Sequence, residues 1–507
     1  MRYLIGIDVG TTGAKALLID EKGKIIAKGS QEYPLLTPKI GWAEQNPEDW
    51  WKATRRAIGE VLKSSGINSA DVKGIGLSGQ MHGAVFLDKK GKILRPAILW
   101  CDQRTEDECR KINEIVGEQK VLELTSNPVL TGFTAPKILW VKRHQPEIYE
   151  RTDKILLPKD YIRYKLTGVF ASEVSDASGT SLFNVRERKW SKVMLDKLGI
   201  DSSLLPPVYE SQEISGRINK KAAKETALAE GTPVVGGAGD QAAGGLGNGI
   251  VEKGIVSSTI GTSGVIFAYA ERARVDKAGR VHTFCHAVEK AWHIMGVMLS
   301  AGGSLRWFRD NFCLEEIKEA KRKGIDPYEL LTEKAKKVPP GSQGLIFLPY
   351  LMGERTPHKD ARARGGFFGL TTSHKKEHLI RSIMEGVAFG LKDSLEILKE
   401  LSIEIKEIRA SGGGARSSLW CQIAADIFGK KVLRSNIKEA PAHGVALLAG
   451  VGSGIFENIR SACKKTIKVI DTIEPVPENI EQYEKYYQVY HSLYPALKPS
   501  FDKLSTI

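Results

Sequence analysis

A single acidic residue, Asp240, stands in a run of small residues, Gly236–Gly245. Packing alone needs no charge in such a run, and the neighbouring glycines allow a ligand to approach the backbone closely. A carboxylate in this setting is suited to act as a general base that takes a proton from a reacting hydroxyl. The alternative is that Asp240 is the N-cap of a helix, and the two roles can coexist.

A second pattern is the turn Asp8–Gly13, which is rich in glycine and threonine and is followed by Lys15. The backbone N–H groups of such a turn, together with the hydroxyls of Thr11 and Thr12, can hold phosphate oxygens. Asp8 can hold Mg²⁺ through water, and Lys15 can add a point charge beside a transferring phosphate. The alternative is an ordinary hairpin turn.

The segment Ser411–Ser418 contains three glycines and precedes an expected helix over residues 419–428. A glycine-rich loop at a helix N-terminus favours an anion or a nucleotide, although a flexible loop with a serine cap would look the same. The GxGxxG pattern at Gly74–Gly79 lies in an extended stretch, so we reject a dinucleotide-binding loop there. The histidines and cysteine between His282 and His293 do not have the spacing of a zinc site.

These residues must be positioned by strands and helices in two similar halves. Strands over Tyr3–Ile7 and Ala14–Asp20 should flank the first turn. Asn46 should cap a helix that Gly66 ends, and residues 379–398 should form a long helix. Asp8–Gly13 aligns with Thr259–Gly264, about half a chain later. We therefore expect two domains, 1–252 and 253–507.

Composition excludes several classes of protein. The formal net charge is +14, but the basic residues form short pairs among acids, which argues against a nucleic-acid partner. There is no apolar run of about 18 residues, so we expect no membrane partner. The six cysteines include no CxxC pair, which favours a reducing, cytoplasmic location.

Longer segments resemble the FGGY carbohydrate kinase family. Asp8–Thr12 is similar to the phosphate hairpin of the actin–hexokinase–Hsp70 superfamily, Gly132–His144 to the first FGGY signature, and Gly365–Glu385 to the second. The landmarks run from residue 3 to about 450. The resemblance implies an α/β fold of two ribonuclease-H-like domains around a central cleft. It also implies that sugar binds mainly on the first domain and ATP mainly on the second.

Within the family, Gly79–Gly83, Trp100–Thr105, Leu157–Tyr161 and Gly239–Gln241 are similar to members that phosphorylate D-xylulose with ATP. Glycerol kinases carry an Arg-Glu pair in place of Met81-His82. The resemblance implies Asp240 as the general base and Mg²⁺ near Asp8. The implied sugar contacts are Gln80, Met81, His82, Asp102, Asp240 and Gln241. The implied ATP contacts are Thr11, Thr12, Lys15, Gly261, Thr262, Gly302, Trp307, Gly413, Gly414 and Ser417.

Two alternatives to this reaction stay open. One is a kinase for another ketose, a polyol or a sugar acid, and the other is a non-catalytic regulator on the same scaffold. The presence of both Asp8 and Asp240 favours an enzyme. Pro441–Gly444 departs from the family pattern of small or aliphatic residues and leaves the shape of a late helix undecided. The sequence also leaves open whether the protein is a homodimer.

Overall fold

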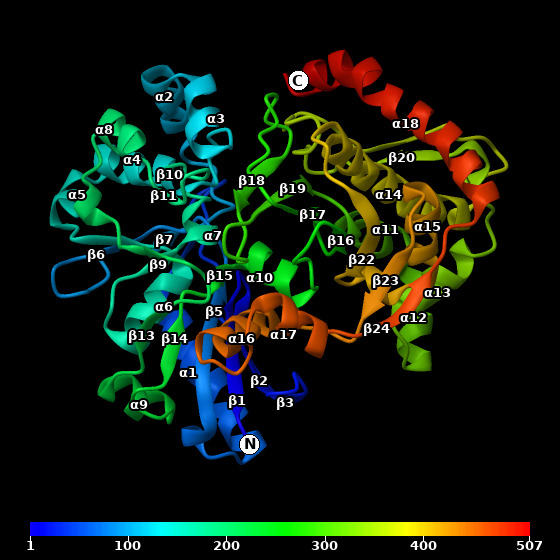
Figure 1. Ribbon diagram of the computed structural model, residues 1–507. Helices are drawn as coiled ribbons and strands as arrows, with labels where there is room; N and C mark the ends of the chain where they lie inside the picture. The colour runs from blue at the N-terminus through cyan, green and yellow to red at the C-terminus, as the bar shows by residue number, and fades with distance from the viewer. Residues whose placement is uncertain (507) are drawn as a thin grey trace.

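Two seven-stranded sheets with helices against them form the framework of the protein (Figure 1). They are seen in a computed structural model that describes residues 1–506. The first sheet has the order β13-β14-β5-β1-β2-β3, with β15 beside β5, and the second has the order β18-β19-β17-β16-β22-β23-β24. The first-sheet strands are β1 (Tyr3–Val9), β2 (Gly13–Asp20), β3 (Ile25–Glu32), β5 (Val72–Gly79), β13 (Ile214–Arg217), β14 (Pro233–Val235) and β15 (Ala238–Gly239). The second-sheet strands are β16 (Gly254–Ile260), β17 (Gly264–Ala270), β18 (His282–Cys285), β19 (Trp292–Met298), β22 (Ile405–Ser411), β23 (Val432–Ser435) and β24 (Val469–Ile473).

Each sheet opens with the same arrangement of strands. β1 is antiparallel to β2 and parallel to β5, and β16 is antiparallel to β17 and parallel to β22. The two aligned turns of the sequence therefore occupy equivalent places, each at the tip of the first hairpin of its sheet. The predicted α/β class with two ribonuclease-H-like halves is confirmed. The boundary at residue 252 stays a prediction.

Helices predicted from local signals begin and end where those signals stand. Helix α1 (Pro47–Ser65) has Asn46 as its N-cap, whose side chain accepts a hydrogen bond from the Glu48 N–H, and Gly66 ends it with φ 64°. Helix α14 (Lys376–Glu400) contains the predicted long helix, and α15 (Ser418–Phe428) follows the glycine-rich loop. Local capping chemistry therefore determines these boundaries.

The remaining elements surround the two sheets. The other helices are α2 (Glu106–Val116), α3 (Glu118–Thr125), α4 (Thr134–His144), α5 (Pro146–Arg151), α6 (Pro158–Thr167), α7 (Val174–Ala177), α8 (Lys192–Leu198), α9 (Lys220–Thr226), α10 (Asp240–Gly247), α11 (Gly302–Phe312), α12 (Leu314–Lys323), α13 (Pro327–Ala335), α16 (Ala440–Gly452), α17 (Ile459–Thr466) and α18 (Pro477–Leu504). The short strands are β4 (Glu44–Gln45), β6 (Val85–Leu87), β7 (Ala97–Ile98), β8 (Lys154–Leu156), β9 (Ser172–Glu173), β10 (Phe183–Asn184), β11 (Lys189–Trp190), β12 (Val208–Tyr209), β20 (Ile346–Leu348) and β21 (Gly366–Phe368). Within residues 1–506, no helix combines the length and the apolar character needed to span a membrane.

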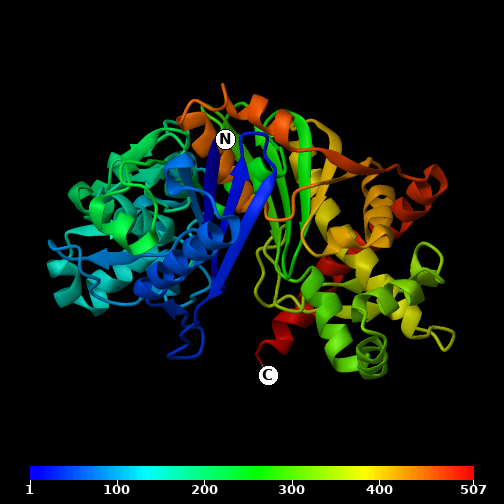
Figure 2. The same ribbon diagram turned by 90° about the horizontal axis from the view of Figure 1, so that it is seen from below.

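Helix α16 comes from the second half of the chain but packs against the first sheet, as the orange helix beside the blue strands shows in Figure 2. The contact depends on glycine. A Cβ atom added at Gly6 would lie 1.8 Å from the Ala442 carbonyl oxygen, and one at Gly76 would lie 1.9 Å from that of Val445. The GxGxxG pattern therefore lies in strand β5, where Gly76 lets a helix approach the sheet, and the rejection of a dinucleotide loop is confirmed.

The departure at Pro441–Gly444 falls in the first turns of α16. Pro441 stands in the first turn, where a missing N–H is tolerated, and the helix continues without a break to Gly452. The imidazole of His443 is completely buried, and burial lowers its pKa to about 4. A neutral histidine therefore fills a core position, and the helix keeps its regular shape.

Candidate active site

A cleft of about 1120 Å³ is lined by residues from both halves of the chain. Asp8, Lys15 and Asp240 lie on the side of the first sheet, and Ser411–Gly413 lies at the end of β22. A volume at the upper end of the usual range for ligand pockets suits two substrates side by side. The cleft therefore brings together the acidic residues and one of the glycine-rich loops singled out in the sequence.

Asp240 is the first residue of α10 and is half-buried at the cleft. The N-cap position belongs to Gly239, so the Asp240 carboxylate is not occupied as a helix cap. Burial raises the pKa of Asp240 to about 7, and the nearby charge of Asp8 contributes further. A general base works best with a pKa close to the working pH. The environment of Asp240 therefore suits proton transfer near neutrality.

Asp8 lines the cleft next to the turn between β1 and β2. The Ser78 hydroxyl donates to Asp8 Oδ1 at 2.9 Å, and Lys15 stands opposite on β2. Burial raises the pKa of Asp8 above its usual value, and Glu439 acts in the same direction. The Lys15 Nζ pairs with Glu439 Oε2 at 2.9 Å. Sequence reasoning missed Glu439, because it precedes α16 and is more than 400 positions from Lys15.

A network of side chains supports the Asp8–Gly13 turn. Gln80 Nε2 donates to Gln45 Oε1 at 2.9 Å, and Gln45 Nε2 donates to the Thr11 carbonyl at 2.7 Å. The indole N–H of Trp100 donates to the Thr11 hydroxyl at 2.9 Å. Gln80 is buried in this network, which favours a role in shaping the turn over the sugar contact predicted from the sequence. Thr12 is exposed at the tip of the turn.

Met81 and His82 lie beside the segment that leads to Asp240. A Cβ atom added at Gly239 would lie 2.9 Å from Met81 Cγ, so the Met81 side chain packs directly on this segment. The His82 ring lies 2.7 Å through Nδ1 from the Gly179 carbonyl oxygen. Gln241 follows Asp240 and also lines the cleft. Gln241 thus lies on the cleft beside Asp240, and Met81 packs on the segment that precedes Asp240, whereas His82 contacts the Gly179 segment; their sugar-binding role stays a prediction.

Asp102 differs from this group. Its side chain is completely buried, and both carboxylate oxygens accept hydrogen bonds from the Arg104 guanidinium, at 2.9 and 2.7 Å. The Ala43 N–H donates to Asp102 Oδ2 at 2.6 Å. A carboxylate engaged in this way has little capacity left for a ligand, so the geometry favours a structural role in place of the predicted sugar contact.

On the side of the second sheet, the Gly261–Thr262 turn meets the start of α11, and the loop at Gly414 packs on Ile260. The Gly302 N–H donates to the Gly261 carbonyl at 2.8 Å, and the Gly303 N–H donates to the Thr262 carbonyl at 3.0 Å. A Cβ atom added at Gly414 would lie 2.6 Å from Ile260 Cβ. Glycine is needed here because the backbone segments approach one another closely.

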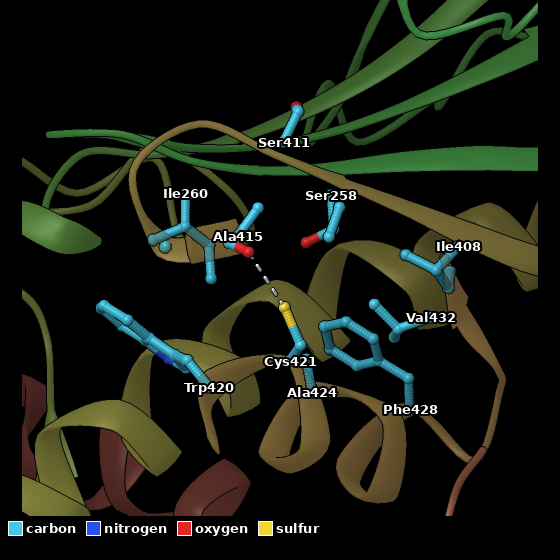
Figure 3. Close-up of a pocket in the computed structure, with 12 residues that line it drawn as sticks. Ser258, Ile260, Ile408, Ser411, Ala415, Trp420, Cys421, Ala424, Phe428 and Val432 are labelled. Atoms are coloured by element: carbon cyan, nitrogen blue, oxygen red, sulfur yellow. Dashed lines mark hydrogen bonds between the residues drawn. The ribbon is translucent and has the colours of Figure 1, made fainter. Parts of the chain in front are cut away.

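Trp307, Gly413 and Ser417 were also predicted to contact ATP. Gly413 lines the cleft, and Trp307, on α11, is 37% exposed. The Ser417 hydroxyl accepts a hydrogen bond from the Trp420 N–H at 3.2 Å and so acts as the N-cap of α15. Beneath this loop is a cavity of about 10 Å³, into which Cys421 points (Figure 3). The observed role of Ser417 is thus the serine cap that was the alternative to nucleotide binding.

A cluster of five ionisable side chains lies completely buried behind the segment that leads to Asp240. Lys159 Nζ lies 2.7 Å from Asp160 Oδ1, 3.1 Å from Asp176 Oδ2 and 3.5 Å from Glu173 Oε1. Arg163 Nη1 lies 2.6 Å from Asp160 Oδ1. Buried charges persist only when they are paired in this way.

This buried cluster reaches the backbone next to Asp240. The Ser175 hydroxyl donates to Glu173 Oε1 at 2.9 Å and accepts a hydrogen bond from the Gly239 N–H at 3.1 Å. Arg163 also donates to the Gly236 carbonyl. The glycine-rich segment is thus held at two points by the cluster. This support has no local signal in the sequence, because its members come from α6, α7 and the strand before α7.

Basic side chains on the second-sheet side of the cleft were also missed: Arg416, Arg434 and Lys438. Arg434 lies within strand β23. In residues 1–506, no set of three or more histidine, cysteine, aspartate or glutamate side chains is placed to hold a metal ion. A cation at this cleft would have to take most of its ligands from water and from a bound phosphate, which is the usual arrangement for Mg²⁺.

Comparison with known proteins gives a consistent result. Residues 3–247 match the N-terminal domain, and residues 256–453 the C-terminal domain, of the FGGY family of carbohydrate kinases. A xylulose kinase from Bacillus subtilis is 40% identical over 96% of this chain and 95% of its own length. A gluconokinase from the same organism is 36% identical over 95% of this chain and 93% of its own. The crystal structure of a xylulose kinase from Rhodospirillum rubrum has a TM-score of 0.91 at 30% identity, with 99% of this chain and 100% of that chain covered.

Proposed function

The chain belongs to the FGGY family of carbohydrate kinases, and on this basis we propose that it transfers the terminal phosphoryl group of ATP to D-xylulose. The products are ADP and D-xylulose 5-phosphate. The observation that most supports the proposal is that one cleft brings together Asp240, whose pKa is about 7, Asp8 and Lys15 on either side of the first turn, and the glycine-rich loop after β22. These are the parts that phosphoryl transfer to a hydroxyl needs.

Asp240 accepts the proton of the sugar O5 hydroxyl as that oxygen attacks phosphorus. Met81, His82 and Gln241 hold the sugar beside it. The first turn, with Thr11, Thr12 and Lys15, faces the transferring phosphate, and the turns at Gly261–Thr262 and Gly413–Gly414 hold the nucleotide, with Gly302 and Trp307 beside them. Phosphoryl transfer requires little covalent help from the protein, so alignment and charge balance provide most of the rate enhancement.

The residues present fit a bound Mg²⁺ near Asp8. Asp8 and Asp240 lie close enough for each to affect the other, and without a cation the charge of Asp8 disfavours ionisation of Asp240. The Ser78 hydroxyl donates a hydrogen bond to Asp8 Oδ1, and no group within residues 1–506 donates one to Oδ2. When bound, Mg²⁺ neutralises charge on the phosphate oxygens. Asp8 would hold it through water, and Ser78 fixes the orientation of the carboxylate.

We expect the acceptor to be a ketopentose. Met81 is apolar, and burial lowers the pKa of His82 so that its ring is neutral near pH 7. Neither side chain can pair with the carboxylate of gluconate, and glycerol would leave hydrogen-bonding groups of the site unpaired. The kcat/KM for D-xylulose should therefore exceed the values for D-gluconate and glycerol by at least about tenfold. Release of ADP, measured with each acceptor at saturating MgATP, tests this, and a preference for gluconate or glycerol would reject the assignment.

The pH dependence of turnover follows from the pKa of Asp240. Since burial raises this pKa to about 7, the carboxylate loses its proton, and can act as a base, only as pH rises through that value. The kcat/KM for D-xylulose should rise with pH and level off above about 7, with a slope near one below it. Rates measured from pH 5.5 to 9 with coupling enzymes in excess test this. A rate that stays constant down to pH 5.5 would contradict it.

A kinase for another sugar, polyol or sugar acid is the second candidate, and the similarity to a gluconokinase is the observation that favours it. The acceptor series above decides between the two. A homodimeric assembly and a cytoplasmic location stay predictions from the sequence.

A further inference from the structure

We propose that Lys137 is a positioning residue that fixes His82 in the conformation required for sugar binding. The inference rests on the proposed function, because it takes His82 as a sugar contact. Lys137 lies in the Gly132–His144 segment, which identified the family but received no task in the reaction.

Lys137 is 0% exposed on helix α4, and its Nζ meets backbone carbonyl oxygens. It donates to the carbonyl of His82 at 2.9 Å and to that of Gly132 at 2.6 Å. Within residues 1–506, no carboxylate lies within 4.0 Å of this Nζ in an ion pair. Burying an amine without a directly paired carboxylate is costly, and burial lowers the pKa of Lys137 to about 7, although the charge of Asp102 acts in the opposite direction. Since either protonation state keeps N–H donors, the two bonds hold across this pH range.

The residue that Lys137 holds has an unusual backbone. His82 has φ 69°, in the left-handed region that residues other than glycine seldom adopt. Such a conformation persists only where the surroundings impose it. The His82 carbonyl accepts two side-chain hydrogen bonds, one from Lys137 and one from the Thr134 hydroxyl at 3.1 Å. Two donors on one helix thus fix the peptide group that follows the strained residue.

The same segment also fixes the ring of His82. The imidazole stacks on Phe133, with ring centroids 4.5 Å apart and planes 20° from parallel. Its Nδ1 lies 2.7 Å from the Gly179 carbonyl oxygen. Because a carbonyl oxygen only accepts, Nδ1 must carry the proton, and in the neutral ring Nε2 then has a free lone pair. Phe133, Thr134 and Lys137 together therefore present an acceptor nitrogen of defined orientation for a sugar hydroxyl.

Replacing Lys137 with methionine tests this, because the variant keeps the length of the side chain and removes its donors. We expect the KM and the Kd for D-xylulose to rise at least tenfold. The KM for ATP and the slow hydrolysis of ATP without sugar should change less than twofold. Lys142→Met is the matched control, since Lys142 lies on the same helix and donates to the Gly199 carbonyl at 2.6 Å at the surface. It should leave all four quantities unchanged.

A double-mutant cycle separates positioning from a merely structural effect. If Lys137 acts through His82, then Lys137→Met added to His82→Ala should weaken sugar binding no more than His82→Ala alone. Additive losses in the cycle, or a wild-type KM in Lys137→Met, would overturn the inference. If Lys137→Met does not fold, Thr134→Val replaces it in the same cycle, because it removes the other donor to the same carbonyl, and the same two outcomes apply.

Binding of D-xylulose by His82→Ala distinguishes a wrong sugar site from a wrong role for Lys137. If His82→Ala binds D-xylulose like the wild type, the proposed sugar site is wrong, and the positioning role of Lys137 is rejected with it. If His82→Ala binds D-xylulose weakly while Lys137→Met and Thr134→Val bind it normally, the sugar site stands and only the role of Lys137 is rejected.

Discussion

Replacing Asp240 with asparagine should lower kcat by at least about 10²-fold, while the Kd for D-xylulose stays within a few-fold of the wild-type value. The amide keeps the size and shape of the carboxylate but cannot accept a proton. Because Gly239 and not Asp240 is the N-cap of α10, the substitution removes no helix cap. Calorimetric titration with D-xylulose measures binding, and single-turnover mixing with MgATP measures the chemical step.

Asp8→Asn is the comparison that makes this result specific. The proposed task of Asp8 is to position the metal and phosphate, so Asp8→Asn should raise the Mg²⁺ concentration required for half-maximal rate. Asp240→Asn should leave that concentration nearly unchanged. Both variants should unfold at the wild-type temperature. Near-normal turnover of Asp240→Asn would show that Asp240 only binds a hydroxyl, and that the base lies elsewhere in the cleft.

Replacing Lys159 with methionine should lower the free energy of unfolding by about 3–5 kcal/mol, because it leaves the buried Glu173 carboxylate without a cation partner and Asp160 with Arg163 alone. The Lys159, Asp160 and Glu173 side chains are all 0% exposed. In a domain of 150–250 residues such a loss corresponds to a fall of roughly 10 °C in the unfolding midpoint. Thermal unfolding followed by circular dichroism at pH 7 measures it.

Asp176→Asn serves as the control for Lys159→Met. Burial raises the pKa of Asp176 to about 8, so this carboxyl is already protonated and neutral at pH 7. A neutral amide of nearly the same shape should therefore change the unfolding midpoint by only a few degrees. The account of charge balance in the cluster would be wrong if Asp176→Asn were as destabilising as Lys159→Met, or if Lys159→Met melted like the wild type.

Features with a local cause could be predicted from the sequence. The Asn46 cap and Gly66 define α1, because capping depends on neighbouring residues alone. The Asp8–Gly13 turn and the isolated Asp240 stand out by residue type, and the structure places Asp8 and Asp240 on one cleft. Two halves of similar plan were visible in a short repeat, because each sheet opens with the same hairpin.

Features that depend on distant partners could not be predicted. Gln80 and Asp102 have the residue types of sugar ligands, but the structure pairs Gln80 with Gln45 and pairs one oxygen of Asp102 with the Ala43 N–H. Whether a polar side chain faces a ligand or completes a buried network depends on which neighbours the fold brings to it. Glu439 is the opposite case, since only the packing of α16 brings it to Lys15.

The way α16 closes over β1 and β5 has a consequence for biosynthesis. The ribosome makes β1 more than 400 residues before α16, the helix that covers this face of the sheet and ends at Gly452. Until that point has left the exit tunnel, the glycine-lined surface at Gly6 and Gly76 has no native cover. The sheet that is translated first is therefore among the last parts of the nascent chain to be completed, and a ribosome-bound N-terminal half must stay protected from aggregation while most of the second half is synthesised.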